Sequence, residues 1–180
     1  MNKVIVIGNS GVGKSTIVDR YVRGRFNPHL DSTIGSCFHR LTEGKKSLDV
    51  WDTAGQERFR SLMNLYLRDS SIVVIVYDCT DYYSLLSLGD YWVPLVERHL
   101  PQANIVLVQN KIDLQSNPDA RSSGHLPYPT FQTSAKTGEG IDQLFDHLFG
   151  LTPETPLVTL TKKVITPWVK KPRNCCVLGR

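Results

Sequence analysis

The chain has 180 residues, of which 41% are hydrophobic and 21% are charged, a composition typical of one soluble globular domain with a full-sized core. It holds no run of roughly 18 or more apolar residues, which excludes a transmembrane helix. Residue 3 already belongs to the first expected strand, so we expect no signal peptide.

The net charge of +4 is distributed unevenly along the chain. Residues 151–180 carry six basic side chains and one acidic side chain, whereas residues 1–150 sum to −1. A near-neutral body argues against nucleic acid as a partner. A basic tail favours an anionic membrane surface, although a tail that only keeps the protein soluble is an alternative.

Cysteine usage predicts a protein of a reduced, cytosolic compartment. Cys37 and Cys79 are isolated and the chain has no C-x-x-C pair, so neither disulfides nor zinc ligands are expected. The other two cysteines, Cys175 and Cys176, are adjacent and lie within the basic tail.

The apolar run of the first expected strand, Val4–Ile7, leads into a glycine-rich loop and then into a helix over about residues 15–22. Gly8–Ser15 reads GNSGVGKS, which fits the phosphate-binding pattern G-x-x-x-x-G-K-[ST]. The N–H groups of such a loop form an anion-binding nest at the positive end of the helix. Lys14 would reach the β- and γ-phosphates, and the Ser15 hydroxyl would ligate Mg²⁺. A glycine-rich turn at a helix start is the alternative. The other loop positions expected to contact the nucleotide are Ser10, Gly11, Val12, Gly13 and Thr16.

Short apolar runs then alternate with helical stretches. The elements expected in chain order are a loop over 26–33, strands over 35–41 and 47–51 joined by a hairpin at 43–46, a strand over 71–77, a helix over 82–100 capped by Asp81, strands over 105–108 and 130–133, and a helix over 141–148. Pro94 should kink the helix over 82–100 or end its first half. This alternation predicts an α/β fold with a six-stranded, mostly parallel sheet and helices on both faces, in which ligands bind beyond the carboxyl ends of the strands. Residues 1–150 form the expected folded domain, and residues 151–180 are expected to be a flexible tail.

A second polar motif, Asp52-Thr53-Ala54-Gly55-Gln56, follows the strand expected over 47–51. An acid at this strand end can hold Mg²⁺ directly or through water. Gly55 offers an unobstructed N–H to a γ-phosphate, and the amide of Gln56 can orient an attacking water. Taken alone, a D-x-x-G pattern usually means a turn, but after a phosphate loop it indicates a catalytic site.

Two further motifs follow the last two strands and point to guanine. In Asn110-Lys111-Ile112-Asp113 the carboxylate of Asp113 can accept two N–H bonds from guanine, a donor pair that adenine lacks. The stem of Lys111 can lie on the base, and Asn110 can tie the neighbouring loops together. In Ser134-Ala135-Lys136 the N–H of Ala135 can reach the guanine carbonyl, and Lys136 can cover the other face of the base. These motifs favour GTP over ATP, whereas a P-loop ATPase or kinase is the alternative.

With these motifs in place, residues 1–150 resemble the Ras superfamily of small GTPases, and within it the Rab family. The residues that carry the likeness are Ser32-Thr33-Ile34-Gly35 before Phe38, the run Trp51–Leu62 (WDTAGQERFRSL), Tyr66 and Val76–Thr80 (VYDCT). The resemblance implies the small-GTPase fold with residues 1–150 as its GTP-binding domain. It also implies that Thr33 ligates Mg²⁺ and the γ-phosphate, that Phe26 lies near the base, and that about residues 27–38 and 54–68 are nucleotide-dependent switches.

The same resemblance implies a slow, Mg²⁺-dependent GTPase with Gln56, Lys14 and Thr33 as its catalytic residues. Such a protein is a monomer that cycles between the cytoplasm and the cytosolic face of endomembranes. Its partners are effectors, an exchange factor and a GTPase-activating protein, and its role is in vesicle trafficking. The implied effector surface comprises Ile34, Phe38, Trp51, Phe59 and Tyr66, with plain core packing of the aromatic residues as the alternative. A GTP-bound scaffold with little hydrolysis and a Ras-type signalling GTPase outside trafficking remain the competing functions.

The chain departs from the family pattern in several places. The hairpin at 43–46 is shorter than usual. The segment 114–129 is rich in helix breakers, so the helix usual there should be shortened or missing. Ser36 and Cys37 stand where the family usually has valine and aspartate. By resemblance Cys175 and Cys176 are geranylgeranylated, but four further residues follow them, and an unmodified tail is the alternative.

Overall fold

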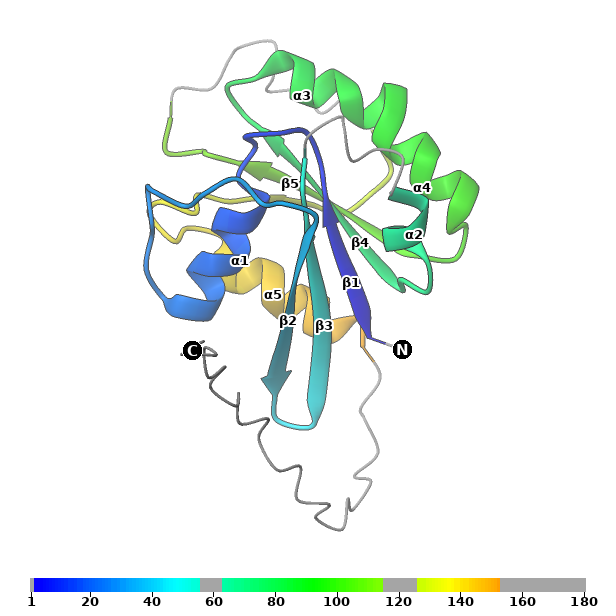
Figure 1. Cartoon of the computed structure of the whole chain (residues 1–180), viewed down its shortest axis with the longest axis horizontal. Coiled ribbons are helices and arrows are strands. Elements are labelled where there is room, and N and C mark those ends of the chain that lie inside the picture. Colours follow the sequence, from blue (N-terminus) through cyan, green and yellow to red (C-terminus); the bar gives the residue numbers. More distant parts are fainter. Residues whose placement is uncertain (1, 56–62, 115–125, 153–180) are drawn as a thin grey trace, which may run out of the picture.

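The computed structural model describes residues 2–55, 63–114 and 126–152. Its centre is a six-stranded sheet with the strand order β2-β3-β1-β4-β5-β6 (Figure 1). The strands are β1 (Lys3–Ile7), β2 (Ser36–Glu43), β3 (Lys46–Thr53), β4 (Ile72–Asp78), β5 (Asn104–Asn110) and β6 (Thr130–Gln132). Only the pair β2·β3 is antiparallel, whereas the other neighbours run parallel. The predicted mostly parallel α/β sheet is thereby confirmed.

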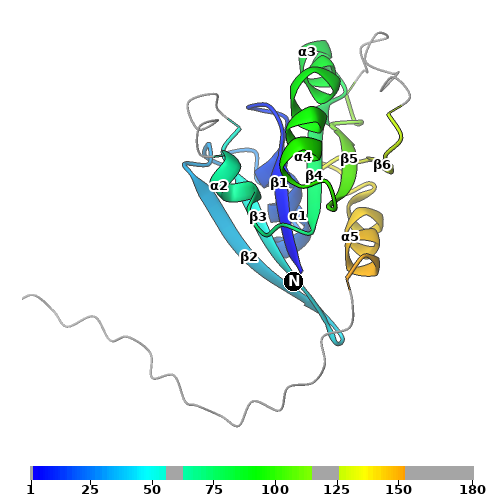
Figure 2. The ribbon, with the colours of Figure 1, turned by 90° about the vertical axis from the view of Figure 1, so that its right-hand side faces the viewer.

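Helices cover both faces of this sheet (Figures 1 and 2). The helices are α1 (Lys14–Arg23), α2 (Met63–Leu67), α3 (Tyr82–Ser87), α4 (Val93–His99) and α5 (Ile141–Gly150). Helices α1 and α5 pack on one face, and α2, α3 and α4 pack on the other. Among the described residues no helix has the length and apolarity needed to cross a bilayer.

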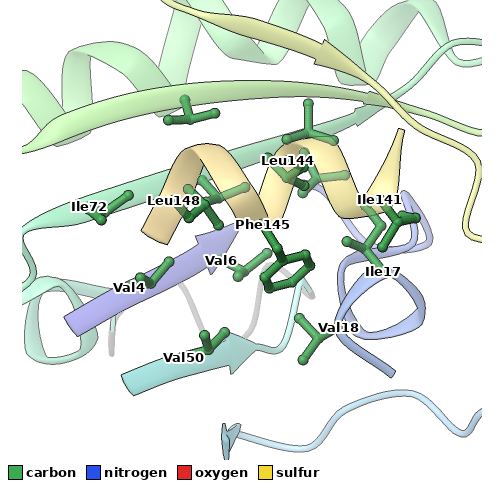
Figure 3. Close-up of a cluster of buried hydrophobic side chains, with 14 of the residues drawn as sticks. Val4, Val6, Ile17, Val18, Val50, Ile72, Ile141, Leu144, Phe145 and Leu148 are labelled. Carbon is green, nitrogen blue, oxygen red and sulfur yellow. The ribbon is translucent and has the colours of Figure 1, made fainter. Parts of the chain in front are cut away.

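The alternation of side chains along the strands builds two cores, one on each face. On β1, Val4 and Val6 belong to the core beneath α1 and α5, whereas Ile5 and Ile7 belong to the core beneath α2, α3 and α4. Figure 3 shows Phe145 projecting from α5 toward the sheet within the first of these cores. Because β1, β4 and β5 are buried on both faces, these three strands are continuous apolar runs and are visible in the sequence.

The helical stretch over 82–100 forms with an interruption next to its proline. Asp81 caps α3 as predicted, since its side chain accepts a hydrogen bond of 3.0 Å from the N–H of Tyr83. The regular helix ends at Ser87, continues as a π-helical segment over Leu88–Trp92, and becomes α-helical again at Val93, with Pro94 in the first turn of α4. A proline lacks an N–H and crowds the preceding turn, and the wider π turn accommodates both effects.

The main differences from the sequence-based elements lie at strand ends. Strand β3 reaches Thr53 rather than residue 51, because Ser36 and Cys37 of β2 pair with Thr53 and Asp52. Asp52 therefore lies inside a strand and not after it, and Asn110 likewise is the last residue of β5. The short helix α2 was not predicted. Most of the segment 114–129 and the whole tail from residue 153 lie outside the described residues, so the expectations about them stay predictions.

Candidate functional site

The loop between β1 and α1 and the long connection between α1 and β2 meet at one end of the sheet (Figure 1). Between them lies a polar cavity of about 220 Å³. It is lined by Ser10, Gly11, Gly13, Lys14, Ser15 and Thr16 of the loop and helix, Leu30, Asp31, Ser32 and Thr33 of the connection, and Thr53 and Gly55 of the β3 end. Val12 is the exception among the predicted loop contacts, because its side chain is buried in the core beneath α1 and α5. The position of the cavity at a helix N-terminus suits an anionic ligand.

Two glycines of this cavity have no room for a side chain. Gly13 has a φ of 94°, and a Cβ there would lie 2.3 Å from Nδ2 of Asn110. A Cβ on Gly55 would lie 2.2 Å from Nζ of Lys14 and 2.5 Å from the carbonyl oxygen of Asn9. Glycine at position 55 therefore lets the end of β3 approach the phosphate loop closely.

Lys14 is folded back onto the loop that precedes it. Its Nζ donates hydrogen bonds to the carbonyl oxygens of Gly8, at 3.0 Å, and of Asn9, at 2.7 Å. Burial lowers the pKa of Lys14 to about 8, partly offset by the negative charge of Asp52. Its ammonium thus stands in a weakly solvated pocket, where an additional anion is strongly favoured.

Three oxygen-bearing side chains converge beside the cavity. Oγ of Ser15 lies 2.5 Å from Oγ1 of Thr33, which in turn donates a hydrogen bond of 3.3 Å to Oδ2 of Asp52. The other carboxylate oxygen of Asp52, Oδ1, is buried and has no hydrogen-bond partner among the described residues. Burial raises the pKa of Asp52, against the opposing effects of hydrogen bonds from Ser15 and Thr33 and the charge of Lys14. An orphaned carboxylate oxygen next to two hydroxyls is a donor set that fits a hard cation such as Mg²⁺.

A second, more apolar cavity of about 280 Å³ adjoins the first. Its lining comprises Gly11, Gly13, Thr16, Phe26, Asn110, Lys111, Asp113, Leu114, Ala135 and Lys136. At this cavity the carboxylate of Asp113 accepts a hydrogen bond of 2.6 Å from Oγ of Ser134, and its other oxygen lies 3.7 Å from Nζ of Lys136. An apolar slot with one fixed carboxylate suits a flat heterocycle that carries N–H donors.

Asn110, at the end of β5, ties the loops after β1 and β6 together, as the sequence predicts. Its Nδ2 donates to the carbonyl of Val12, at 2.9 Å, and its Oδ1 accepts from Oγ1 of Thr133, at 3.1 Å. The N–H of Ala135, which is expected to meet the base, is directed to the same Oδ1 at 3.3 Å. The side-chain amide of Asn110 thereby fixes the loops that line the two cavities relative to one another.

One contact of the phosphate loop has no signal in the sequence. Oδ1 of Asn9 accepts a hydrogen bond of 2.9 Å from Nε1 of Trp92, and its Nδ2 donates one of 3.0 Å to Oγ of Ser87. Both partners belong to the stretch around the π-helical segment, more than 75 positions along the chain. The side chain of Asn9 therefore anchors the loop to the helical layer on the opposite side of the site from α1.

Four of the predicted effector residues are described, and they lie at the edge formed by β2, β3 and α2. Ile34 and Phe38 are exposed, by 81% and 49%, whereas Trp51 and Tyr66 are half-buried and pack partly against the second core. The rings of Phe38 and Trp51 lie 5.3 Å apart, and Nζ of Lys3 lies 5.3 Å from the Trp51 ring centre. Lys3 also donates hydrogen bonds to the carbonyls of Tyr66 and Arg68, which joins the end of α2 to this surface. Gln56 and Phe59 lie outside the described residues, as do Cys175 and Cys176.

Comparison with known proteins defines the class to which this fold and site belong. A family model for the Ras family matches residues 3–152. The chain is 35% identical over 161 residues to the Ras-related protein SEC4 of Saccharomyces cerevisiae, which covers 84% of this chain and 75% of that protein. It is 36% identical over 162 residues to the Ras-related protein SEC4 of Candida albicans, covering 84% and 77%. It is also 35% identical over 156 residues to the GTP-binding protein ypt5 of Schizosaccharomyces pombe, covering 79% and 74%.

The chain therefore belongs to the Ras family of small GTPases. It is a GTPase, an enzyme that hydrolyses GTP, and its named relatives SEC4 and ypt5 are of the Rab type. The predicted family, fold class and enzyme class are confirmed.

We expect the affinity of the nucleotide-free protein for GDP to fall as the pH rises through the Lys14 pKa of about 8. Lys14 attracts phosphate only when it is protonated, so affinity is full below this pKa and declines about tenfold per pH unit above it. Between about pH 7 and pH 8.5 the loss amounts to roughly fourfold, measurable by titration with a fluorescent GDP analogue. The Lys14→Arg variant stays charged over this range, and an equal slope in both proteins would contradict the role of Lys14.

Proposed function

We propose that the protein is a Rab-like switch that binds GTP with Mg²⁺, hydrolyses it slowly and recruits effectors in membrane trafficking while GTP is bound. Its place among the Rab-type relatives SEC4 and ypt5 supports the trafficking role. The observation that carries the guanine assignment is the Asp113 carboxylate, which lies on the apolar cavity and is held there by Ser134. Such a carboxylate matches the paired N–H donors of guanine and rejects adenine.

In this proposal each cavity binds a different part of the nucleotide. The polar cavity beside Lys14 takes the phosphates, and the apolar cavity between Lys111 and Lys136 takes the base, with Phe26 at its edge. Gly13 lines both cavities and so lies at the junction between phosphates and base. A nucleoside triphosphate is the ligand class that fits both cavities at once.

The residues Ser15, Thr33 and Asp52 would hold the Mg²⁺ ion. In phosphoryl transfer this ion neutralises charge on the β- and γ-phosphate oxygens. Lys14 stabilises the same negative charge from the loop side, and the N–H of Gly55 meets the γ-phosphate. Gln56 orients the attacking water. The proposed catalytic residues are therefore Gln56, which orients the water, Lys14, which stabilises the phosphate charge, and Thr33, which would hold Mg²⁺.

The contacts of Thr33 suggest how the conformation of the connection between α1 and β2 depends on the bound nucleotide. Thr33 lies in the connection between α1 and β2, and its hydroxyl bonds with Ser15 and Asp52 draw that connection onto the phosphate loop. In the GTP-bound protein Thr33 would also contact the γ-phosphate, so loss of this phosphate on hydrolysis would weaken the attachment of the connection and favour its release. We expect the effector surface of Ile34, Phe38, Trp51, Phe59 and Tyr66 to change when this connection is released. An exchange factor and a GTPase-activating protein act on the same region.

We further propose that Cys175 and Cys176 are geranylgeranylated and anchor the protein on the cytosolic face of endomembranes. Two lipid chains together with Lys170, Lys171 and Arg173 satisfy the two-signal requirement for stable attachment. In this proposal the protein is a monomer that cycles between the cytoplasm and the cytosolic face of endomembranes. At the membrane, its tail holds the folded domain.

Replacing both Cys175 and Cys176 by serine should lower the membrane-bound fraction of the protein in cells by about tenfold, because the remaining basic residues bind lipid only weakly. Fractionation measures this, and mass spectrometry of the C-terminal peptide identifies the lipid. Asn174→Ser is the matched control, since it introduces a serine beside the same two cysteines and leaves both of them in place. Unmodified cysteines with unchanged membrane residence would contradict the anchor.

A further inference from the structure

We propose that Asp78 is a positioning residue for the nucleotide base, acting on the base only through Lys111. This inference rests on the proposed function, because it takes the apolar cavity lined by Lys111 as the guanine site. Asp78 is the last residue of β4, and no motif for nucleotide binding includes it. Its side chain does not line the cavity.

The carboxylate of Asp78 uses its two oxygens for two different purposes. Oδ2 pairs with Nζ of Lys111 at 2.6 Å. Oδ1 accepts hydrogen bonds from the N–H and the hydroxyl of Thr80, at 2.8 and 2.7 Å, and so fixes the turn after β4. The side chain of Asp78 is only 8% exposed and that of Lys111 is 34% exposed, so water screens this pair less than it would a surface pair.

Although burial acts in the opposite direction, the hydrogen bonds from Lys111 and Thr80 hold the pKa of Asp78 below its ordinary value. The carboxylate is therefore charged at neutral pH, which the ion pair requires.

Lys111 needs support because its backbone is in an unfavourable conformation. Its φ is 66°, a left-handed value that residues with a side chain rarely adopt. Such a residue persists only where its surroundings hold it. The end of β4 and the residue after it supply that support, since Asp78 binds the ammonium group and Sγ of Cys79 donates to the Lys111 carbonyl at 3.1 Å.

The direction of the Lys111 side chain follows from this anchoring. With its backbone on the loop after β5 and its Nζ paired with Asp78 at the end of β4, the aliphatic stem is held at both ends beside the cavity. A stem held in this way offers the base an ordered apolar wall without loss of rotamer freedom on binding. Without Asp78 the stem would be free to leave the cavity wall, and the base would be released faster.

The Asp78→Asn variant distinguishes the pairing of Asp78 with Lys111 from its contribution to the turn through Thr80. An amide keeps Oδ1 as an acceptor for Thr80, but it places an N–H donor where the ammonium group of Lys111 needs an acceptor. We expect a fluorescent GDP analogue to dissociate about fivefold faster from this variant, whereas the preference for guanine over adenine is retained because Asp113 is untouched. Thr80→Val is the matched control, since it weakens the turn but leaves the ion pair, and its release rate should stay near that of the unaltered protein.

A double-mutant cycle with Lys111→Met decides whether Asp78 acts through Lys111. The double variant should release the analogue at the rate of Lys111→Met alone, within about twofold. An unchanged rate for Asp78→Asn, or an equal acceleration in the Lys111→Met background, would overturn the proposal. Failure of the unaltered protein to bind the GDP analogue would instead overturn the proposed function, so the two failures are distinguishable.

Discussion

Asp113→Asn is expected to change the base preference of the protein from guanine to xanthine. The Asp113 carboxylate can accept two N–H bonds from guanine, and in the free protein Ser134 donates to one of its oxygens at 2.6 Å. An asparagine at this position offers one acceptor and one donor, and xanthine carries a carbonyl where guanine carries its exocyclic amine. The variant therefore pairs with xanthine and leaves guanine with facing donors.

The expected size of this effect is a loss of roughly 10³- to 10⁴-fold in GDP affinity, with a comparable relative gain for xanthosine diphosphate. Competition against a fluorescent GDP analogue measures both affinities. Asp81→Asn is a suitable control, because asparagine also caps a helix and Asp81 lies outside the base cavity. A variant that still preferred guanine would refute the assignment of Asp113.

Gln56→Leu is expected to remove most of the activator-stimulated hydrolysis of GTP. Leucine has nearly the same size as glutamine but has no amide with which to orient the attacking water. The activator contributes charge stabilisation that is useful only when this water is in place, so we expect a loss of about 10³-fold in the stimulated rate. Nucleotide affinity should stay within a few-fold of normal, since Gln56 is assigned no part in binding.

Phosphate release in single turnover, with and without the activating protein, measures this effect. Glu57→Gln alters the next residue along the chain and should keep the stimulated rate. If Gln56→Leu were stimulated as strongly as the unaltered protein, the role given to Gln56 would be wrong, and the protein would use another group to orient the water.

The sequence predicts the central strands of the sheet well because β1, β4 and β5 are buried on both faces. The short apolar runs that became β1, β4 and β5 are typical of buried strands, and the nucleotide motifs begin at or within two residues of a strand end. The capping of α3 by Asp81 was likewise predictable, since it depends on residues that are adjacent in the chain.

The features that escaped prediction depend on residues far apart in the chain. The extension of β3 to Thr53 comes from pairing with Ser36, and the anchoring of Asn9 comes from Trp92 in a later helix. The ion pair between Asp78 and Lys111 joins the ends of two strands that neighbour each other only in the folded sheet. Helix α2 has five residues, too few for a helical period to be visible in the sequence.

Single-turnover hydrolysis of GTP and ATP by the purified protein, with and without Mg²⁺, tests the central claim most directly. We predict Mg²⁺-dependent phosphate release from GTP, on the order of 10⁻⁴ to 10⁻³ per second without an activator, and no release from ATP. Equal release from ATP, or stable GTP binding with no hydrolysis at all, would contradict a guanine-specific GTPase switch.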